Sequence, residues 1–325
     1  MTGHLAGLPP LATTGVGSLP FSAPRAAVRH AFDAYDVPFC PQLPRLDGDM
    51  VAEWLGADPA RCGWNAERDR ERPAAWTEFV SALAGSRPRH GLVKLQVTGP
   101  VTLAIALERL AGRTGSGADV ERLAEELAHW LAANVREQIE RIADLGLVAL
   151  VVIDEPGLGG AGIEPGRSRP WAPLSAIAPA WGLHVCGAVP WELVASLEPD
   201  LISFDATLHG FTPGSRPVLR RHLRRGGRVA WGVLDPVAPE GAEVATGLAA
   251  TCVATMTDGE LSPGLVAERS LLTPSCGTGR LAPERERMLA ARLEACARGV
   301  RRGHDALSRK VDGSRRPAHL IATAT

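Results

Sequence analysis

Residue types that bind soft metal ions meet in one short stretch and recur far along the chain. His184 and Cys186 end an apolar run, and Cys276 lies in a Pro-Ser-Cys-Gly segment. An imidazole and two thiolates are favoured Zn²⁺ ligands, and a fourth, open or carboxylate position is typical of catalytic zinc sites. His184 and Cys186 are two residues apart, so they point the same way on an extended segment. With Asp205 as fourth candidate, they predict a zinc site.

Each of these residues also has an ordinary role. Cysteine is among the most buried residue types, so Cys186 and Cys276 could be small core side chains, and His184 a core histidine with satisfied hydrogen bonds. The metal hypothesis therefore depends on all three lying together at strand ends. The remaining cysteines are interpreted as packing residues: Cys40, Cys62, Cys252 and Cys296.

Short apolar runs alternate with helical patterns along the chain. Most of the runs are apolar throughout, as expected of parallel strands buried on both faces. Eight strand–helix repeats are the number that closes a (β/α)8 TIM barrel, the predicted α/β fold; a doubly wound open sheet is the alternative. The predicted strands are residues 14–17, 38–41, 92–97, 148–153, 183–185, 201–204, 229–232 and 271–273. The predicted helices are residues 100–111, 120–145, 192–197, 216–224, 241–256 and 283–300.

The sequence predicts a single catalytic domain. The barrel is expected over residues 13–303, with a lead-in at 1–12, disordered over its first eight residues, and a basic, flexible tail at 304–325. A helical insertion at 50–89 is expected between the second and third strands, covering one end of the barrel.

Polar residues follow nearly every predicted strand. In a barrel the active site lies at these carboxyl ends, and a purely structural barrel has no reason to place aspartates after three buried strands. Asp154 and Asp235 are the catalytic candidates; Asp154 could bind an ammonium group or act in acid–base chemistry. Glu155 is expected to cap a helix, and Asp235 could cap a loop. The candidate substrate-binding residues are Gly17, Ser18, Gln42 and Asp154.

Composition excludes several classes of protein. A formal net charge of −1 over 325 residues provides no bulk attraction for nucleic acid or membranes. No stretch reaches the roughly 18 apolar residues of a membrane span, and no signal peptide is recognised. Six scattered cysteines favour a reducing compartment, so a cytoplasmic location is expected. The arginine-rich run at 220–225 is interpreted as a solvated helix face.

Taken together, the motifs resemble the catalytic barrel of cobalamin-independent methionine synthase, within a superfamily that includes uroporphyrinogen decarboxylase. The motifs, in family order, are Thr14-Gly15-Val16-Gly17-Ser18, Thr98-Gly99-Pro100-Val101-Thr102, Ile153-Asp154-Glu155-Pro156, His184-Val185-Cys186, Leu201-Ile202-Ser203-Phe204-Asp205 and Pro274-Ser275-Cys276-Gly277. The resemblance implies a zinc site that activates the thiol of homocysteine. It implies His184, Cys186 and Cys276 as zinc ligands, with Asp205 where the family has glutamate.

The resemblance also implies how homocysteine is held. Gly17 and Ser18 match the segment that contacts its carboxylate, and Asp154 matches the carboxylate that holds its amino group. The family has a second carboxylate for the amine near the position of Gln42, but this sequence has no Asp or Glu in Gln42-Leu43-Pro44. The family histidine proposed to protonate the departing folate is replaced by Val237.

These departures suggest a methyl donor other than methyl-folate. The family's second barrel, which helps to hold folate, has no room in this chain. Methylcobalamin needs no general acid, because cob(I)alamin departs unprotonated. We therefore expect methylcobalamin, free or on a corrinoid protein, as the donor to a small-molecule thiol.

Three alternatives stay open. The first is a zinc thiol-alkyltransferase that uses another thiol or alkyl donor, and the second is a decarboxylase-like lyase without metal. The third is a corrinoid- or metal-binding partner protein that has lost turnover.

Overall fold

The strands form one parallel sheet. The computed structural model describes residues 2–56, 72–114, 117–209, 212–238 and 241–313. Within these residues, seven strands pair in the order β1-β7-β6-β5-β4-β3-β2, every pair parallel. The strands are β1 (Ala12–Thr13), β2 (Leu92–Thr98), β3 (Val148–Asp154), β4 (Ala180–Val185), β5 (Leu201–Asp205), β6 (Arg228–Leu234) and β7 (Ser270–Pro274).

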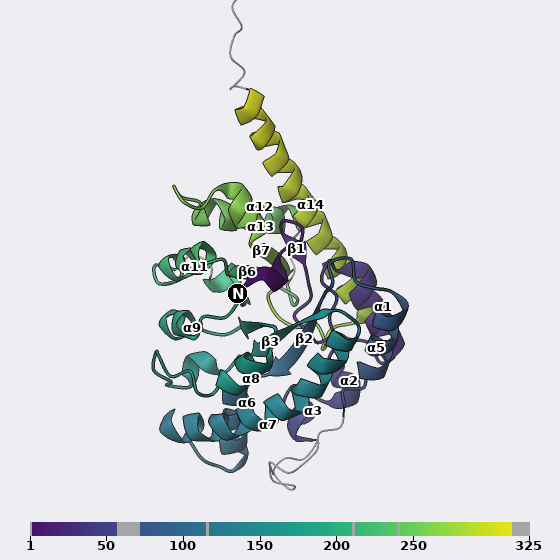
Figure 1. Ribbon diagram of the computed structural model, residues 1–325, viewed down its shortest axis with the longest axis vertical. Coiled ribbons are helices and arrows are strands. Elements are labelled where there is room, and N and C mark those ends of the chain that lie inside the picture. Colours follow the sequence, from purple (N-terminus) through teal and green to yellow (C-terminus); the bar gives the residue numbers. More distant parts are fainter. Residues whose placement is uncertain (1, 57–71, 115–116, 210–211, 239–240, 314–325) are drawn as a thin grey trace, which may run out of the picture.

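The sheet curls, and helices cover its outer face (Figure 1). This arrangement is consistent with a TIM-like barrel. The helices are α1 (Pro24–Ala34), α2 (Pro44–Asp47), α3 (Ala52–Leu55), α5 (Trp76–Gly85), α6 (Pro100–Leu110), α7 (Gly117–Asp144), α8 (Ala172–Ile177), α9 (Trp191–Leu197), α10 (Ala206–His209), α11 (Ser215–Arg224), α12 (Ala242–Met256), α13 (Pro263–Glu268) and α14 (Pro283–Gly313). Two short 3₁₀ turns are η1 (Thr2–Leu5) and η2 (Leu158–Gly160).

The second predicted strand is not a regular strand. Within residues 38–41 only Phe39 forms a bridge, with Lys94, because Pro38 and Pro41 have no amide hydrogen to donate to a ladder. The segment nevertheless bonds to both edges of the sheet. Val37 N donates to Thr13 O at 3.0 Å, and Cys40 N donates to Lys94 O at 3.0 Å.

The first predicted strand is misplaced by a few residues. β1 is Ala12–Thr13, whereas the prediction began at residue 14. The backbone bond from Thr14 N to Leu272 O, 3.1 Å long, extends the pairing by one residue. The glycine-rich residues after it form the loop that leads into the site.

The predicted helices agree with the structure in position, and α7 shows why. Its buried side chains recur every three or four residues, so one face packs on the barrel. They are Val120, Ala124, Leu127, Ala128, Trp130, Leu131, Ala132, Val135, Ile139 and Ile142. Several other helices begin with proline in the first turn, where no amide hydrogen is needed.

The N-terminal residues contribute to the core, so the expectation of a disordered lead-in is wrong. Leu5 and Leu8 are buried in a cluster with side chains from the amino ends of the strands. Its strand members include Ala12, Leu92, Leu150, Ala180, Leu201, Ala230 and Leu271. Burial of this apolar surface fixes the segment against the end of the barrel opposite the predicted site.

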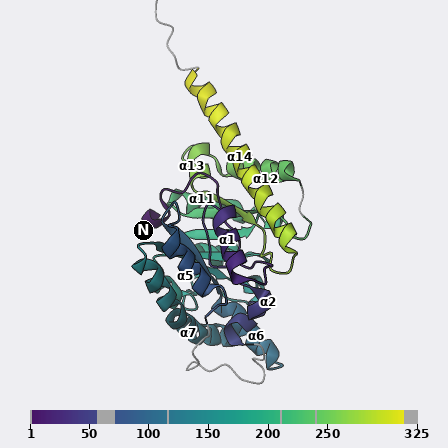
Figure 2. The same cartoon turned by 90° about the vertical axis from the view of Figure 1, so that its right-hand side faces the viewer.

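The predicted insertion at residues 50–89 contains helices, whereas the C-terminal segment is helical further than predicted. Helices α3 and α5 fall within residues 50–89, while residues 57–71, with Cys62, lie outside the described part of the chain. Helix α14 continues to Gly313, past the predicted end at residue 300, and its second half projects beyond the rest of the fold (Figure 2). Residues 304–313 are therefore helical, where a flexible tail was expected.

A buried carboxylate joins the first and last long helices. Glu286 Oε1 accepts hydrogen bonds from Tyr35 OH at 2.7 Å and contacts His30 Nε2 at 3.0 Å. Burial and the neighbouring carboxylate raise the pKa of Tyr35 well above its usual range. The loops that precede α1 and α14 both reach the site, so this contact helps to hold them together.

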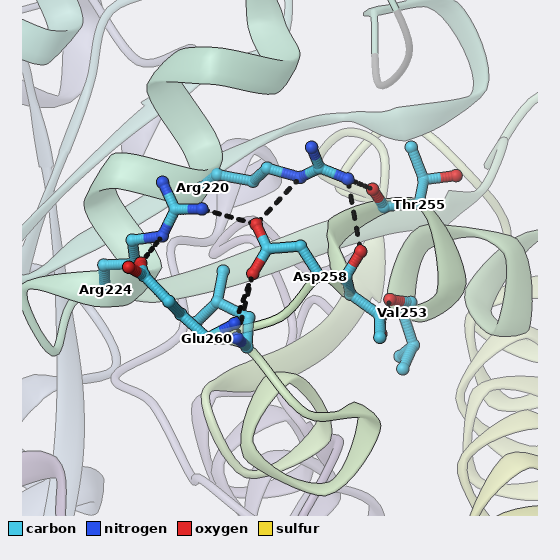
Figure 3. Close-up of polar contacts among 8 residues, drawn as sticks. Arg220, Arg224, Val253, Thr255, Asp258 and Glu260 are labelled. Atoms are coloured by element: carbon cyan, nitrogen blue, oxygen red, sulfur yellow. Dashed lines mark hydrogen bonds and ion pairs between the residues drawn. The ribbon is translucent and has the colours of Figure 1, made fainter.

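The arginines of α11 make structural ion pairs. Arg220 donates to Thr255 O at 2.8 Å, and Arg224 pairs with Asp258 and Glu260 (Figure 3). These contacts tie α11 to the loop after α12. The predicted solvated face is thus partly engaged in packing two neighbouring repeats together. No helix in the described ranges combines the length and apolarity of a membrane span.

The packing of the N-terminal segment can be tested by substitution. Leu5→Ala should lower the free energy of unfolding by about 2–5 kcal/mol, because it leaves a cavity among buried side chains. Leu110→Ala, at a half-exposed position, is the control and should change it by about 0.5 kcal/mol or less. Urea unfolding measures both. Equal effects would show that residues 1–8 do not close this end of the barrel.

Candidate active site

A cavity of about 560 Å³ lies at the carboxyl ends of the strands. Eight of the nine site residues predicted from the sequence line it: Ser18, Gln42, Asp154, His184, Cys186, Asp205, Asp235 and Cys276. Gly17 lies just behind it, where a Cβ atom would come within 2.7 Å of the Gln96 side chain. The parallel sheet thus brings together residues that are far apart in sequence.

The two cysteine thiols are hydrogen-bonded to each other. Cys186 follows β4 and Cys276 follows β7, and the Cys186 thiol donates to the Cys276 sulfur. This bond lowers the pKa of Cys276 to about 6 and raises that of Cys186 far above its usual range. Cys276 is exposed, and Cys186 is half-buried. The arrangement favours a thiolate on Cys276 at neutral pH.

His184 presents one nitrogen without a partner. Its Nδ1 lies 2.8 Å from Ser203 Oγ on β5, and its Nε2 is buried with no hydrogen-bond partner among the described residues. Burial, with a smaller effect of Lys94, lowers the pKa of His184 to about 3, so the imidazole is neutral at physiological pH. A neutral imidazole with one nitrogen oriented by a neighbour is the form that binds metals.

Asp205 is partly committed to local structure. Its Oδ1 accepts hydrogen bonds from Thr207 N at 2.8 Å and from Thr207 Oγ1 at 2.5 Å, which caps α10. The Asp205 carboxylate is close enough to Cys276 to influence its pKa. Over the described ranges, no group of three or more His, Cys, Asp or Glu side chains stands ready-formed as a metal site.

Asp154 and Glu155 have separate roles. Glu155 accepts from Val101 N at 3.1 Å and from Thr102 N at 2.8 Å, which confirms the predicted helix cap, here on α6. Burial raises the pKa of Glu155 to about 7 against these hydrogen bonds. Gly99 is required there, because a Cβ atom would lie 2.0 Å from Glu155 Cδ. Asp154 is buried at the wall of the cavity.

Two polar residues of β2 that were not predicted from the sequence support Asp154. Lys94 and Gln96 are buried on β2, and the Gln96 amide donates to Asp154 Oδ1. Lys94 Nζ donates to Gln96 Oε1 and to Val16 O, the latter at 2.6 Å. The sequence contains a signal for them: Lys94, Gln96 and Thr98 alternate with the apolar residues of this strand, which is buried along its whole length.

A carboxylate that the sequence did not place also lines the cavity. Glu53 of α3 accepts a hydrogen bond of 2.7 Å from Gln42 Nε2. Gln42 is held beside the loop after β1, because its backbone N donates to Gly17 O at 3.1 Å. Ser18 Oγ in turn accepts from Gly279 N at 3.3 Å, next to the Cys276 segment.

The mouth of the cavity carries the remaining candidates. Asp235 Oδ1 accepts from Val237 N at 2.8 Å, which confirms its loop-capping role. Val237 is 79% exposed and lines the cavity. Cys252 and Cys296 are buried in packing positions, as predicted, and Cys40 is buried in the core.

The chain is similar to a known protein in structure but not in sequence. No protein-family model and no curated protein matches the sequence. A B12-independent methionine synthase from Shewanella sp. W3-18-1, solved in complex with selenomethionine, is similar in structure. The fold is methionine synthase-like. The two chains are 15% identical, the match covers 92% of this chain and 100% of the other, and the TM-score is 0.56. At this identity the likeness concerns the fold alone.

The thiol pair makes a measurable prediction. In the presence of a metal chelator, alkylation of Cys276 by iodoacetamide should follow a midpoint near pH 6, because the Cys186 thiol stabilises the thiolate. Cys186→Ala removes that donor and should move the midpoint upward by at least about one pH unit. A change of this size is expected when a charged group loses one stabilising hydrogen bond.

Peptide mass spectrometry can follow each cysteine separately. Buried Cys252 serves as the internal control, because it should react only after unfolding. A midpoint for Cys276 that is the same in the wild type and in Cys186→Ala would show that the two sulfurs do not interact.

Proposed function

We propose that this protein is a zinc-dependent methyltransferase that activates the thiol of homocysteine and methylates it to methionine. The observation that supports this most is the meeting of the Cys186 and Cys276 thiols in the cavity that His184 also lines. The methionine synthase-like fold is consistent with an enzyme of this type.

The donor set has the chemistry of a zinc site. His184 Nε2 is a buried nitrogen that has no hydrogen-bond partner in the described part of the chain, and two sulfurs lie in the same cavity. We propose that His184, Cys186 and Cys276 hold the ion, with Asp205 as the fourth ligand. Bound zinc would lower the pKa of a ligated substrate thiol, so that a thiolate exists at neutral pH.

Residues around the cavity can hold the rest of the substrate. Asp154 offers a carboxylate to an ammonium group, and Glu53 supplies the second carboxylate that appeared to be missing near Gln42. Gly17 and Ser18 are proposed to lie against the substrate carboxylate. This set favours an amino acid thiol over the alternative of a thiol without an amino group.

The methyl donor is proposed to be methylcobalamin, free or carried by a corrinoid protein. Among the described residues that line the cavity, His184 is the only histidine, and Val237 replaces the proposed acid. Asp235 is the nearby catalytic candidate at the mouth. The similar solved structure is named a B12-independent enzyme, so methyl-folate is the donor that the experiment must compare.

The domain architecture and the cellular compartment are also proposals. Residues 37–42 would take the place of the second strand, so that residues 13–303 form a single-domain (β/α)8 barrel. Cys186, Cys252, Cys276 and Cys296 are free thiols, which favours a reducing, cytoplasmic compartment.

Metal content tests the proposed site directly. Purified protein should contain about one zinc per chain, as expected of one three- or four-ligand site, and Cys276→Ser should lose most of it. Cys252→Ala, a change in the distant core, should keep the metal. Elemental analysis after dialysis gives the result. Absence of zinc from the wild type would favour the decarboxylase-like alternative.

The donor is tested with the zinc-loaded enzyme and homocysteine. Methionine should form with methylcobalamin and not with methyl-folate, because cob(I)alamin leaves without a proton. Cys276→Ser should abolish turnover. Activity with methyl-folate alone would refute the donor assignment, and tight zinc binding without any turnover would favour the non-catalytic alternative.

A further inference from the structure

One of only two lysines in this chain lies inside the barrel. The sequence contains Lys94 and Lys310 among 35 basic residues, and arginine takes all other basic positions. Lys94 is 2% exposed, in the middle of β2. Burying an ammonium group costs several kcal/mol unless it is well paired, so a lysine kept here needs a specific reason.

The contacts of Lys94 connect two parts of the site. Its Nζ donates to Val16 O, in the loop that leads to Ser18, and to Gln96 Oε1. It also lies 5.1 Å from the centre of the Phe39 ring. The Gln96 amide nitrogen then donates to Asp154 Oδ1. One chain of hydrogen bonds therefore runs from the loop after β1 to the end of β3.

The direction of these bonds is fixed by chemistry. In its charged form Lys94 can only donate, so the Gln96 oxygen then faces Lys94 and the Gln96 NH₂ group faces Asp154, as the structure shows. Asp154 Oδ1 is consequently held as an acceptor. Among the described residues, the bond from Gln96 is the only hydrogen bond of the Asp154 side chain. The carboxylate also lines the cavity.

We propose that Lys94 is a positioning residue that, through Gln96, orients Asp154 to accept the ammonium group of an α-amino thiol. The inference rests on the proposed function and concerns the substrate class of that site. Lys94 also sets the distance between Asp154 and the loop after β1, which are proposed to hold the amino and carboxylate groups. Burial lowers the pKa of Lys94 to about 7 and raises the pKa of Asp154 well above its usual range, and the attraction between the two groups opposes both shifts.

Lys94 is not placed to react with substrate itself. It does not line the cavity, and Gln96 lies between it and Asp154. Arginine would not replace it easily, because the planar guanidinium is larger and needs more acceptors than Val16 O and Gln96 Oε1 provide. The compact ammonium fits the space beside Phe39.

Binding to the zinc-loaded protein tests this role without relying on turnover. Calorimetry compares homocysteine with 4-mercaptobutyrate, which lacks only the amino group. The wild type should prefer homocysteine. Lys94→Met and Gln96→Met should each weaken homocysteine binding by about tenfold, which corresponds to about 1.4 kcal/mol, and should leave 4-mercaptobutyrate nearly unchanged.

A control separates positioning from general loss of packing. Val93→Ala removes a buried side chain from the same strand outside the hydrogen-bonded chain, and it should lower stability without changing the preference. The double variant Lys94→Met/Gln96→Met should be no worse than either single variant, because both break one network.

The outcomes distinguish this inference from the proposed function. If the wild type binds both thiols equally, recognition of the amino group is absent, and both the homocysteine assignment and the role of Lys94 are overturned. If the wild type discriminates and the two variants discriminate as well as Val93→Ala does, the role of Lys94 alone is overturned.

Discussion

The backbone hydrogen bonds of residues 37–42 determine where the site can form. On one side they bond to Thr13 and Gly17, and on the other side to Lys94. Because the segment lies between the two edge strands of the sheet, it brings the loop after β1 next to β2. Ser18 and Gln42 can then face the same cavity as Asp154 and Cys276. Without this link, the substrate-binding candidates would lie on an open edge.

The interior of the fold changes in polarity along its axis. At the amino ends of the strands, Leu5 and Leu8 close an apolar cluster. Toward the carboxyl ends, buried polar side chains follow on neighbouring strands, including Lys94, Asp154 and His184. The apolar end supplies burial that stabilises the fold, while the polar end is tolerated because its groups bond to one another. The same strands thus serve stability at one end and chemistry at the other.

Sequence patterns predicted the parts of this fold that depend on periodicity. The strands from β2 to β7 and the long helix α7 were found because apolar runs and amphipathic spacing are local properties. The errors fall where distant contacts decide the structure. Residues 38–41 contain two prolines, and their place between β1 and β2 depends on pairing with residues far away. Leu5 is ordered only because the barrel end it covers exists.

The candidate site shows the same division. His184, Cys186 and Cys276 were found from residue type and position after predicted strands, and the structure brings them to one cavity. Glu53 was missed because its helix lies inside an insertion whose path the sequence does not specify. Lys94 and Gln96 were missed although a lysine in a buried strand is itself a signal, because an apolar run was read as packing alone.

Asp154 and Glu155 show how closely scaffold and site depend on each other. At the end of an extended strand, successive side chains point to opposite sides. The Asp154 carboxylate therefore lines the cavity, while the Glu155 carboxylate faces the helices outside. Glu155 accepts the first amide hydrogens of α6 and a bond of 3.0 Å from Trp171 Nε1, which fixes the end of β3 against two neighbouring segments. The backbone of Asp154 is fixed by the same contacts, and the hydrogen bond from Gln96 then orients the Asp154 carboxylate. The Asp154 carboxylate is therefore restrained by its neighbour in sequence as well as by its neighbour across the sheet, as the proposed ammonium-binding role requires.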